Sequence, residues 1–259
     1  MCSKFVRSLA LLAAVSCSVL EDRSECPCRL YLDFSSLSCK AYDSLCYTIW
    51  GDEGEYEYSS EFFYEGEDDG VTVPVSCRGD VYVAVYPGDF AHMLNAGACT
   101  MPGSEQAVPL YSYHGQCDTR QESAILKVEM HKQFCTLTLE FVTDDSQKYL
   151  LAVESSYAGM TVDGRPLEAK MKFHIPGNGS EPMSCRLPRQ NSGSDLKLLV
   201  ADASGHVRIF ALGMILESAG YDWTAADLED VYLRLDYKNM AASVSAATWE
   251  EEVFVPVVI

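Results

Sequence analysis

Apolar and polar residues alternate with a period of two along much of the chain beyond residue 28. The alternation is clear at residues 30–34, 71–75, 81–85, 126–130, 137–141 and 233–236. One apolar and one polar face per strand is typical of antiparallel sheets that pack on one side. The pattern therefore predicts an all-β protein built from antiparallel β-sandwiches.

Helical signals are few and short. Residues 91–96 can form one or two turns, and residues 213–219 predict a short helix that ends at Gly220. Thr224 and Asp227 have the spacing of a capping box, with Trp223 and Leu228 placed as its hydrophobic staple. The spacing predicts a third short helix there.

The chain has no exact internal repeat, but it divides into two halves of similar β content with a joint near residues 144–157. We predict a signal peptide at 1–16, a lipidated tether at 17–27, and two β-sandwich domains at 28–148 and 149–259. A single β domain that spans the whole mature chain is the alternative.

The first 16 residues have the pattern of an export signal. Lys4 and Arg7 precede the short apolar run from Leu9 to Val15, which is too short to span a bilayer and suits a secretory leader. Small residues directly before Cys17 resemble a bacterial lipobox. The resemblance implies that Cys17 becomes the first mature residue and carries diacylglycerol on sulfur and an acyl chain such as palmitate on nitrogen. The alternative is an ordinary cleaved signal with an incidental cysteine.

The chain is strongly acidic. Its formal net charge is −19, and loss of the two basic leader residues makes the mature charge −19 − 2 = −21. Such a surface repels nucleic acid and is not drawn to anionic headgroups. We therefore expect no nucleic-acid partner, and any attachment to the outer membrane must come from lipid.

Eleven cysteines are many for a chain of this length. In an exported protein they are disulfide candidates, and nine remain beyond Cys2 and Cys17, an odd number that leaves at least one unpaired. Cys39 and Cys46 are near enough to close a small loop. The nine are Cys26, Cys28, Cys39, Cys46, Cys77, Cys99, Cys117, Cys135 and Cys185. Because no CxxC pair occurs, we predict no metal site and no cofactor.

Motifs that would carry chemistry are absent or weak. Residues 51–70 hold nine carboxylates but lack the EF-hand pattern, so a solvated hairpin is expected. The tripeptide Arg78-Gly79-Asp80 has the sequence of an adhesion motif, but it directly precedes a predicted strand. A glycine there is explained more simply by a strand entry or a bulge. No GxSxG, HExxH or Walker sequence occurs. We expect no catalytic residues and no enzymatic activity.

The C-terminal segment is apolar on both faces. Val253, Phe254, Val255, Val257, Val258 and Ile259 follow three glutamates, and Pro256 interrupts them. Such a strand must be buried on both sides or inserted into a partner. It is either the last strand of the protein's own sheet or a donor strand for β-augmentation.

Two segments resemble a known family. Residues 20–33 and 212–237, with Trp249 beyond them, resemble the anchor subunits of Bacteroidales type V fimbriae, the FimB and minor-fimbrium anchor proteins. Residues 47–50 and 78–82 also fit. The resemblance implies two transthyretin-like sandwiches and a surface-exposed outer-membrane lipoprotein of the fimbrium. It also implies strand exchange with a stalk subunit.

A surface glycan-binding or adhesive lipoprotein, including a fimbrial tip adhesin, is the alternative. Its ligand would be a host or bacterial surface molecule. The aromatic residues Trp50, Tyr56, Tyr58 and Trp223 would then form a sugar-stacking platform. A hydrolase would need clustered acids in a cleft.

Overall fold

The computed structural model describes most of the chain beyond residue 25. The described residues are 26–37, 42–51, 57–63, 69–76, 78–95, 98–100, 103–145, 147–161, 163–177, 181–249 and 251–256. Several sequence predictions lie outside them: the leader at 1–16, Cys17 and most of the tether, Cys39, Cys77, Tyr56, Val257, Val258 and Ile259.

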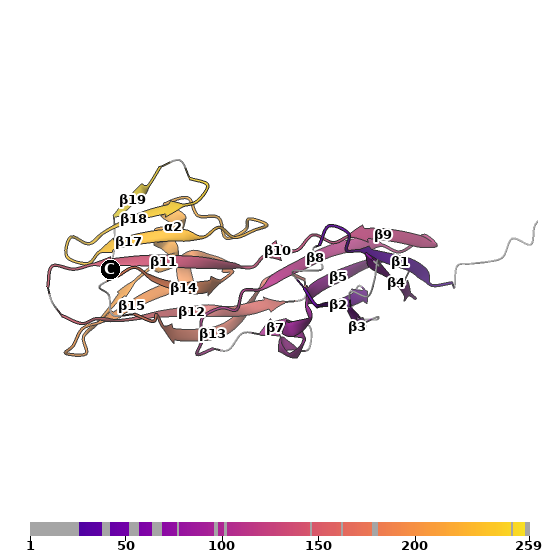
Figure 1. Cartoon of the computed structure of the whole chain (residues 1–259), viewed down its shortest axis with the longest axis horizontal. Helices are drawn as coiled ribbons and strands as arrows, with labels where there is room; N and C mark the ends of the chain where they lie inside the picture. Colours follow the sequence, from indigo (N-terminus) through magenta and orange to yellow (C-terminus); the bar gives the residue numbers. More distant parts are fainter. Residues whose placement is uncertain are drawn as a thin grey trace, which may run out of the picture.

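Two β-sandwiches lie end to end in an elongated molecule (Figure 1). In the first, a three-stranded sheet of order β4-β1-β9 faces a five-stranded sheet of order β10-β8-β5-β2-β3. The strands are β1 (Cys28–Asp33), β2 (Ser44–Gly51), β3 (Glu57–Phe63), β4 (Gly70–Val75), β5 (Asp80–Pro87), β8 (Tyr111–Asp118), β9 (Ser123–Lys127) and β10 (His131–Lys132).

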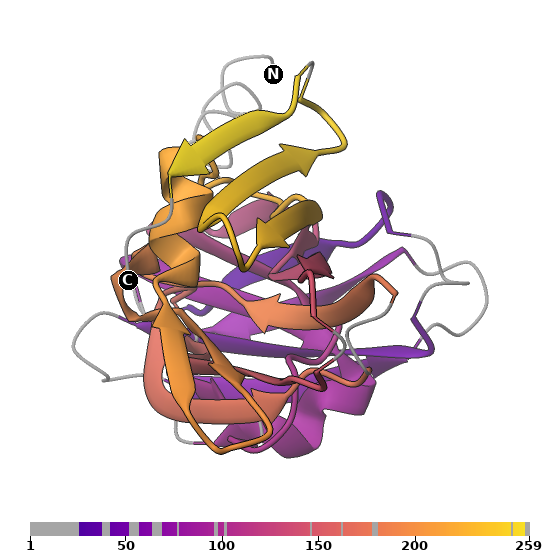
Figure 2. The same cartoon turned by 90° about the vertical axis from the view of Figure 1, so that its left-hand side faces the viewer.

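The second sandwich pairs a five-stranded sheet of order β14-β11-β17-β18-β19 with a sheet of order β16-β15-β12-β7-β6, where β13 also pairs with β12. Figure 2 shows these sheets one above the other, with the short helix α2 at one side. The elements are β6 (Leu94–Asn95), β7 (Ala98–Thr100), β11 (Phe134–Val142), β12 (Leu150–Thr161), β13 (Pro166–His174), β14 (Met183–Pro188), β15 (Lys197–Ala201), β16 (Val207–Phe210), α2 (Leu212–Ser218), β17 (Val231–Asp236), β18 (Ala241–Ala246) and β19 (Val253–Pro256). The predicted all-β architecture of two tandem sandwiches is confirmed.

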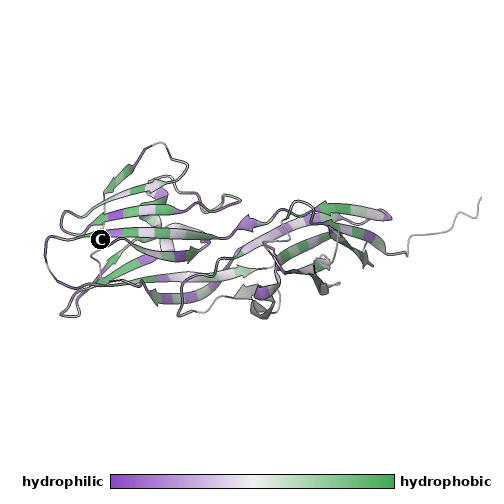
Figure 3. Cartoon of the chain, viewed as in Figure 1, coloured by the Kyte–Doolittle hydropathy of each residue, from purple (hydrophilic) through white to green (hydrophobic). Residues whose placement is uncertain are grey.

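Alternating burial along the strands explains why these residues form sheets. On β1 the side chains of Cys28, Leu30 and Leu32 are fully buried, while the residues between them reach solvent. On β11 Leu137, Leu139 and Phe141 are buried in the same way. The alternation is visible along several strands in Figure 3. Removal of these apolar faces from water is the main favourable term in sandwich formation.

The two sandwiches share a plan that the sequence does not reveal as a repeat. β1 lies between the antiparallel strand β4 and the parallel strand β9. Likewise, β11 lies between the antiparallel strand β14 and the parallel strand β17. β1 and β11 are therefore both interior strands of their sheets, hydrogen-bonded on both edges.

Strands cross the expected boundary between residues 148 and 149. β11 precedes that boundary, yet it pairs with β14 and β17 and contributes to the second core. The hairpin of β6 and β7 precedes it too, and β7 pairs with residues 159–161 of β12. The sequence shift near 144–157 marks the loop between β11 and β12, not the junction, because β11 has the same alternation as the strands on either side.

Two of the three helix predictions find a counterpart. α2 ends as expected before Gly220, whose φ is +99°, and a 3-10 helix, η2 (Gly88–Met93), lies near the predicted turns at 91–96. A second 3-10 turn, η3 (Gly193–Asp195), was not foreseen. The helix predicted at Thr224 is wrong: Thr224 donates to Asp222, while Asp227 accepts from the backbone N–H of Lys132. Among the described helices, none has the length and apolar character needed to cross a membrane.

Candidate functional site

An arginine at the outer end of the first sandwich holds several backbone carbonyls together. Arg78 follows β4, and its Nη1 donates to the carbonyl oxygens of Gln121 at 2.7 Å, Arg120 at 3.1 Å and Thr119 at 3.5 Å. Its Nη2 donates to the carbonyl oxygen of Cys26. These contacts, the first clamp, join the chain before β1 to the loop before β9.

An arginine in the second sandwich makes the same kind of contacts. Arg189 directly follows β14, and its Nη1 donates to the carbonyl oxygens of Trp223 at 2.6 Å and Ala225 at 2.7 Å. Its Nη2 donates to Ala226 at 2.9 Å and to Lys132 at 3.5 Å. These contacts, the second clamp, join the chain before β11 to the loop before β17.

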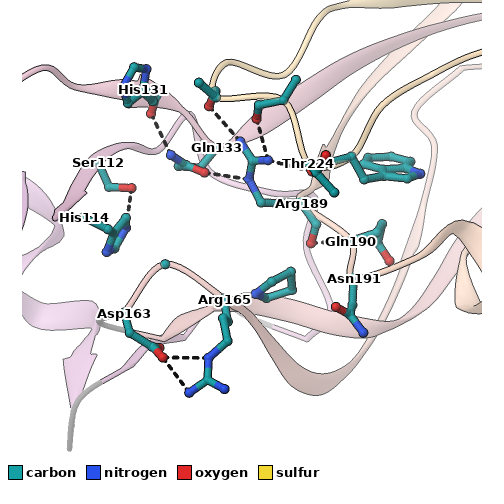
Figure 4. Close-up of a pocket in the computed structure, with 15 residues that line it drawn as sticks. Ser112, His114, His131, Gln133, Asp163, Arg165, Arg189, Gln190, Asn191 and Thr224 are labelled. Carbon is teal, nitrogen blue, oxygen red and sulfur yellow. Dashed lines mark hydrogen bonds and ion pairs between the residues drawn. The ribbon is translucent and has the colours of Figure 1, made fainter. Parts of the chain in front are cut away.

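The second clamp forms one wall of a cleft of about 360 Å³ at the junction of the sandwiches (Figure 4). Arg189 is only 8% exposed. The other walls come from β8, from β10, and from the turn between β12 and β13, where Asp163 and Arg165 pair with each other. The lining residues are Ser112, His114, His131, Gln133, Asp163, Gly164, Arg165, Pro166, Arg189, Gln190, Asn191, Trp223, Thr224, Ala225 and Ala226.

A serine and a histidine in this cleft are hydrogen-bonded but are not placed for nucleophilic catalysis. Ser112 Oγ and His114 Nε2 are 2.8 Å apart. Ser112 is fully buried, and its hydroxyl also contacts the sulfur of Met160. A nucleophile must reach its substrate, and this hydroxyl does not reach solvent. The Ser112 hydroxyl instead connects β8 to β12 through Met160.

Two carboxylates fix β10 and the start of β11 to the loop before β17. Asp227 accepts from the Lys132 N–H at 2.6 Å and contacts His131 Nδ1 at 3.1 Å. Asp230 accepts from Lys132 Nζ and from the Thr136 N–H, both at 2.6 Å. Burial alone would raise the pKa of each carboxyl, but these hydrogen bonds outweigh it and lower the pKa of both. Both are therefore ionised at neutral pH.

No cluster of three or more histidine, cysteine or acidic side chains that could hold a metal ion occurs in the described part of the chain. Within the described part of the acidic segment, β3 pairs antiparallel with β2 and so forms one strand of a hairpin. Phe62 on β3 packs against Phe34 at 5.0 Å between ring centroids. Phe62 thus serves the core of the first sandwich, whereas Tyr58 and Phe63 on the same strand are exposed.

The described part of the apolar C-terminal segment, β19, forms an edge strand. β19 pairs antiparallel with β18 and ends the strand order of its sheet. Val255 is buried and Val253 packs against the second core, whereas Phe254 is 77% exposed. The expectation of burial on both faces therefore fails at Phe254. The strand lies in the protein's own sheet, and its outer edge is unpaired among the described strands.

The Arg78-Gly79-Asp80 tripeptide is used internally. Arg78 makes the first clamp, and Asp80 pairs with Arg120 at 3.0 Å. Sequence reasoning noticed Arg78 only as part of this motif and missed Arg189 altogether. No local pattern marks either clamp, because the carbonyls that each arginine binds are 34 to 57 residues away from it.

The three described aromatic residues considered for sugar stacking, Trp50, Tyr58 and Trp223, do not form one platform. Trp50 stacks on Tyr82, with ring centroids 5.5 Å apart and an interplanar angle of 19°. Tyr58 lies against Tyr47 instead, at 6.2 Å. Trp223 is only 3% exposed and packs edge-on against Tyr221. The Trp50–Tyr82 pair is therefore the part of the proposed platform that remains.

No protein-family model and no curated protein matches the sequence. Solved structures do match the fold over most of its length. The fimbrial anchor protein Mfa2 of Porphyromonas gingivalis aligns with 86% of this chain and 98% of its own, with a TM-score of 0.61 and 12% identity.

Two further structures show the same two-sandwich fold. A Bacteroides thetaiotaomicron protein proposed to bind polysaccharides aligns with 87% of this chain and 98% of its own, with a TM-score of 0.58 and 9% identity. A proposed adhesin from Bacteroides ovatus aligns with 92% and 98%, with a TM-score of 0.56 and 12% identity. The resemblance to fimbrial anchor subunits is thus confirmed at the level of the fold.

Proposed function

We propose that the protein is a surface-exposed outer-membrane lipoprotein that acts as an anchor or minor structural subunit of a fimbria. Cys17 carries the lipid, and the apolar C-terminal segment takes part in strand exchange with a stalk subunit. The observation that carries the proposal is the fold shared with the fimbrial anchor protein Mfa2 along almost the entire length of that protein.

The shape of the molecule supports this assignment. β1, which follows the tether, lies in the sandwich at one end of the long axis, and β19 lies in the sandwich at the other (Figure 1). A lipid at Cys17 would therefore hold one end at the membrane and leave the exposed β19 edge pointing toward a partner. An unpaired edge strand offers backbone donors and acceptors to an incoming strand.

The membrane attachment is tested by mass spectrometry of the mature N-terminus from the native membrane. We expect a chain that begins at Cys17 with diacylglycerol and an amide-linked acyl group. A mature chain that begins at any other residue, or an unmodified Cys17, would refute the tether. Cys17→Ser should release the protein from the membrane fraction.

The role of β19 is tested by locking it to its neighbour. Ser243 and Phe254 are directly paired on β18 and β19, so Cys substituted at both positions can be bridged. If β19 is donated to the stalk subunit, the oxidised lock abolishes incorporation into fimbriae and reduction restores it. If β19 instead accepts a strand at its outer edge, the lock has no effect.

Deletion of residues 253–259 tests whether the segment takes part in strand exchange at all, either as a donor or as an acceptor. Either mode predicts that the shortened chain is lost from fimbriae. Its folding is checked by the thermal transition, because Val255 belongs to the second core. Normal incorporation of the shortened chain would refute strand exchange at this segment.

A surface glycan-binding role is the second candidate, and the Trp50–Tyr82 stack favours it. Aromatic faces bind sugar rings, and this pair is partly exposed. Selective binding on a glycan array that is lost in Trp50→Ala and kept in Tyr58→Ala would support this role. An array that shows no selective binding would refute the glycan-binding role.

A further inference from the structure

Two cysteines enter the core of the first sandwich from opposite sheets. Cys28 is the first residue of β1 and is fully buried in that core. Cys117 lies on β8 in the facing sheet and packs against the same core, as does Tyr113 four residues earlier on that strand. Because side chains of one strand face the same side at every second position, Cys117 and Tyr113 both point inward. Both thiols therefore lie between the sheets.

The first clamp brings the backbone of the two cysteines to the same end of the sandwich. Arg78 binds the carbonyl of Cys26, two residues before Cys28, and the carbonyl of Thr119, two residues after Cys117. Thr119 is itself fixed to Gly79 by a hydrogen bond between its N–H and the Gly79 carbonyl of 2.8 Å. The Arg78 guanidinium thus holds the start of β1 and the end of β8 close to each other.

The electrostatics place these two thiols near each other, as they also do for Cys135 and Cys185. Burial is the largest cause of the raised pKa of Cys117, and the negative charge of a Cys28 thiolate is the next. Burial also raises the pKa of Cys28, against a smaller lowering by Arg78. Both groups are therefore thiols at neutral pH in the folded, reduced protein.

The other buried pair of thiols is not placed in this way. Cys135 and Cys185 lie on the adjacent strands β11 and β14, but Cys135 pairs with Leu187 and Cys185 pairs with Leu137. They are therefore diagonal neighbours in one sheet, a relation that separates Cα atoms by about 7–8 Å. A disulfide usually spans 4.4–6.8 Å between Cα atoms. This pair serves as an internal comparison.

We propose that Cys28 and Cys117 form a disulfide that joins the two sheets of the first sandwich beside the point where the tether enters it. The structure records both as free thiols, so the bond needs an oxidant, which we assign to a disulfide-carrying thiol oxidoreductase. The Cys117 thiolate attacks the disulfide of that enzyme and releases one of its sulfurs. The Cys28 thiolate then attacks the Cys117 sulfur and releases the other. The two protein thiols lose two electrons and two protons, which the enzyme retains as a dithiol.

The bond would change how force enters the protein. Without it, tension on the tether acts on the end of β1 and opens the hydrogen bonds to β4 and β9 one pair at a time. With the disulfide in place, tension passes through the two sulfurs to β8 before it acts on the hydrogen bonds of β1. This mechanical consequence rests on the proposed function, whereas the bond itself does not depend on the lipid or on a fimbrial partner.

Peptide mapping of the purified full chain tests the bond. The reduced chain is equilibrated with oxidised and reduced glutathione at pH 8, alkylated and digested with trypsin. We expect residues 24–29 linked to residues 79–120, with fragmentation assigning the bond to Cys28 and Cys117. Reduction should lower the melting temperature by about 5–15 °C, because the bond closes a loop of roughly 90 residues.

Matched variants decide between neighbouring sulfurs. Cys26→Ser, Cys99→Ser and Cys185→Ser should keep the linked peptide, and Cys28→Ser or Cys117→Ser should lose it. Alkylation of both Cys28 and Cys117 after oxidation of the unsubstituted chain would overturn the proposal. A bond that persists in Cys28→Ser, or one that fragmentation assigns to Cys26, would overturn it as well.

Discussion

The two sandwiches share one strand arrangement with an arginine clamp, but the two clamps are buried to different extents. In each, an interior strand, β1 or β11, lies between an antiparallel and a parallel neighbour. An arginine after the antiparallel neighbour binds carbonyls that precede this strand and its parallel neighbour. The first clamp lies at an outer end and is partly exposed, whereas Arg189 is 8% exposed at the junction. A hydrogen bond to a charged group gains strength away from water. The same device should therefore matter more in the second sandwich.

The sandwiches also end differently after their parallel strand. In the first, β9 is the edge of its sheet, and Ile125 on it is 74% exposed. In the second, β18 and β19 extend the sheet, so the exposed edge moves two strands outward to Phe254. The added hairpin is thus a feature of the second sandwich alone, and it is the part that we assign to the partner.

Truncation of corresponding core leucines should give the largest effects. Leu32 on β1 and Leu139 on β11 are both fully buried on an interior strand of their sheet. We expect Leu32→Ala and Leu139→Ala each to lower the free energy of unfolding by about 2–5 kcal/mol. Hydrogen exchange measured by mass spectrometry should show each loss mainly in its own sandwich. Equal loss of protection in both would mean that the two cores unfold as one unit.

Removal of the clamps comes next and tests the difference directly. Arg189→Met leaves the carbonyls of Trp223, Ala225 and Ala226 without their donor inside the protein, and we expect a loss of about 3 kcal/mol. Arg78→Met returns its carbonyls to water and should cost about 1 kcal/mol. Urea unfolding measures both, with Arg189→Lys and Arg78→Lys as matched variants that keep the charge but lack the planar fork. Equal losses would contradict the comparison.

Acidification should weaken the junction more than the outer end. The folded-state pKa values of Asp227 and Asp230 are lowered, so their stabilisation is present above the unfolded pKa near 4 and is lost as pH falls through the folded pKa. Both side chains are more than half exposed, so we expect about 0.5–1 kcal/mol for each carboxylate between pH 5 and 2.

The aspartate variants provide the control for this pH dependence. Asp230→Asn should reduce the slope of unfolding free energy against pH in that range. The pKa of Asp33 is lowered by Ser35 within a single turn, so Asp33→Asn should leave hydrogen exchange at the junction unchanged. A junction that keeps its protection at pH 3 would contradict this assignment.

Charge substitutions at the two exposed edges should have the smallest effect on stability. Phe254→Asp and Ile125→Asp each replace an exposed apolar side chain, so both should change the unfolding free energy by less than about 0.5 kcal/mol. Only Phe254→Asp should reduce incorporation into fimbriae. Loss of incorporation in Ile125→Asp alone would place the partner on the first sandwich.

The sequence predicts the strands well because alternation records burial directly. Residues 30–34, 71–75 and 81–85 coincide with β1, β4 and β5 within a residue or two. It fails at Thr224, where the local capping pattern competes with distant partners. Arg189 binds three carbonyls of that loop, and Lys132 supplies the backbone donor for Asp227. Such contacts form only after the chain has folded, so a local pattern does not contain them.

The domain boundary fails for a related reason. β11 has the same alternation as the strands before it, and only its pairing with β14 and β17 assigns it to the second sandwich. The junction cleft likewise gathers residues from 112 to 226, which no spacing rule connects. What the sequence can predict here is the single strand, and what it misses is the pairing between strands.

The hairpin of β6 and β7 has a consequence for modularity. The backbone runs from η2 in the first half to this hairpin on β12, returns to β8, and crosses again into β11. Neither sandwich is therefore a continuous stretch of the gene. A recombination event that moved one sandwich to another protein would leave β7 behind or take β8 with it. The pair of sandwiches is the smallest unit that can be inherited or exchanged intact.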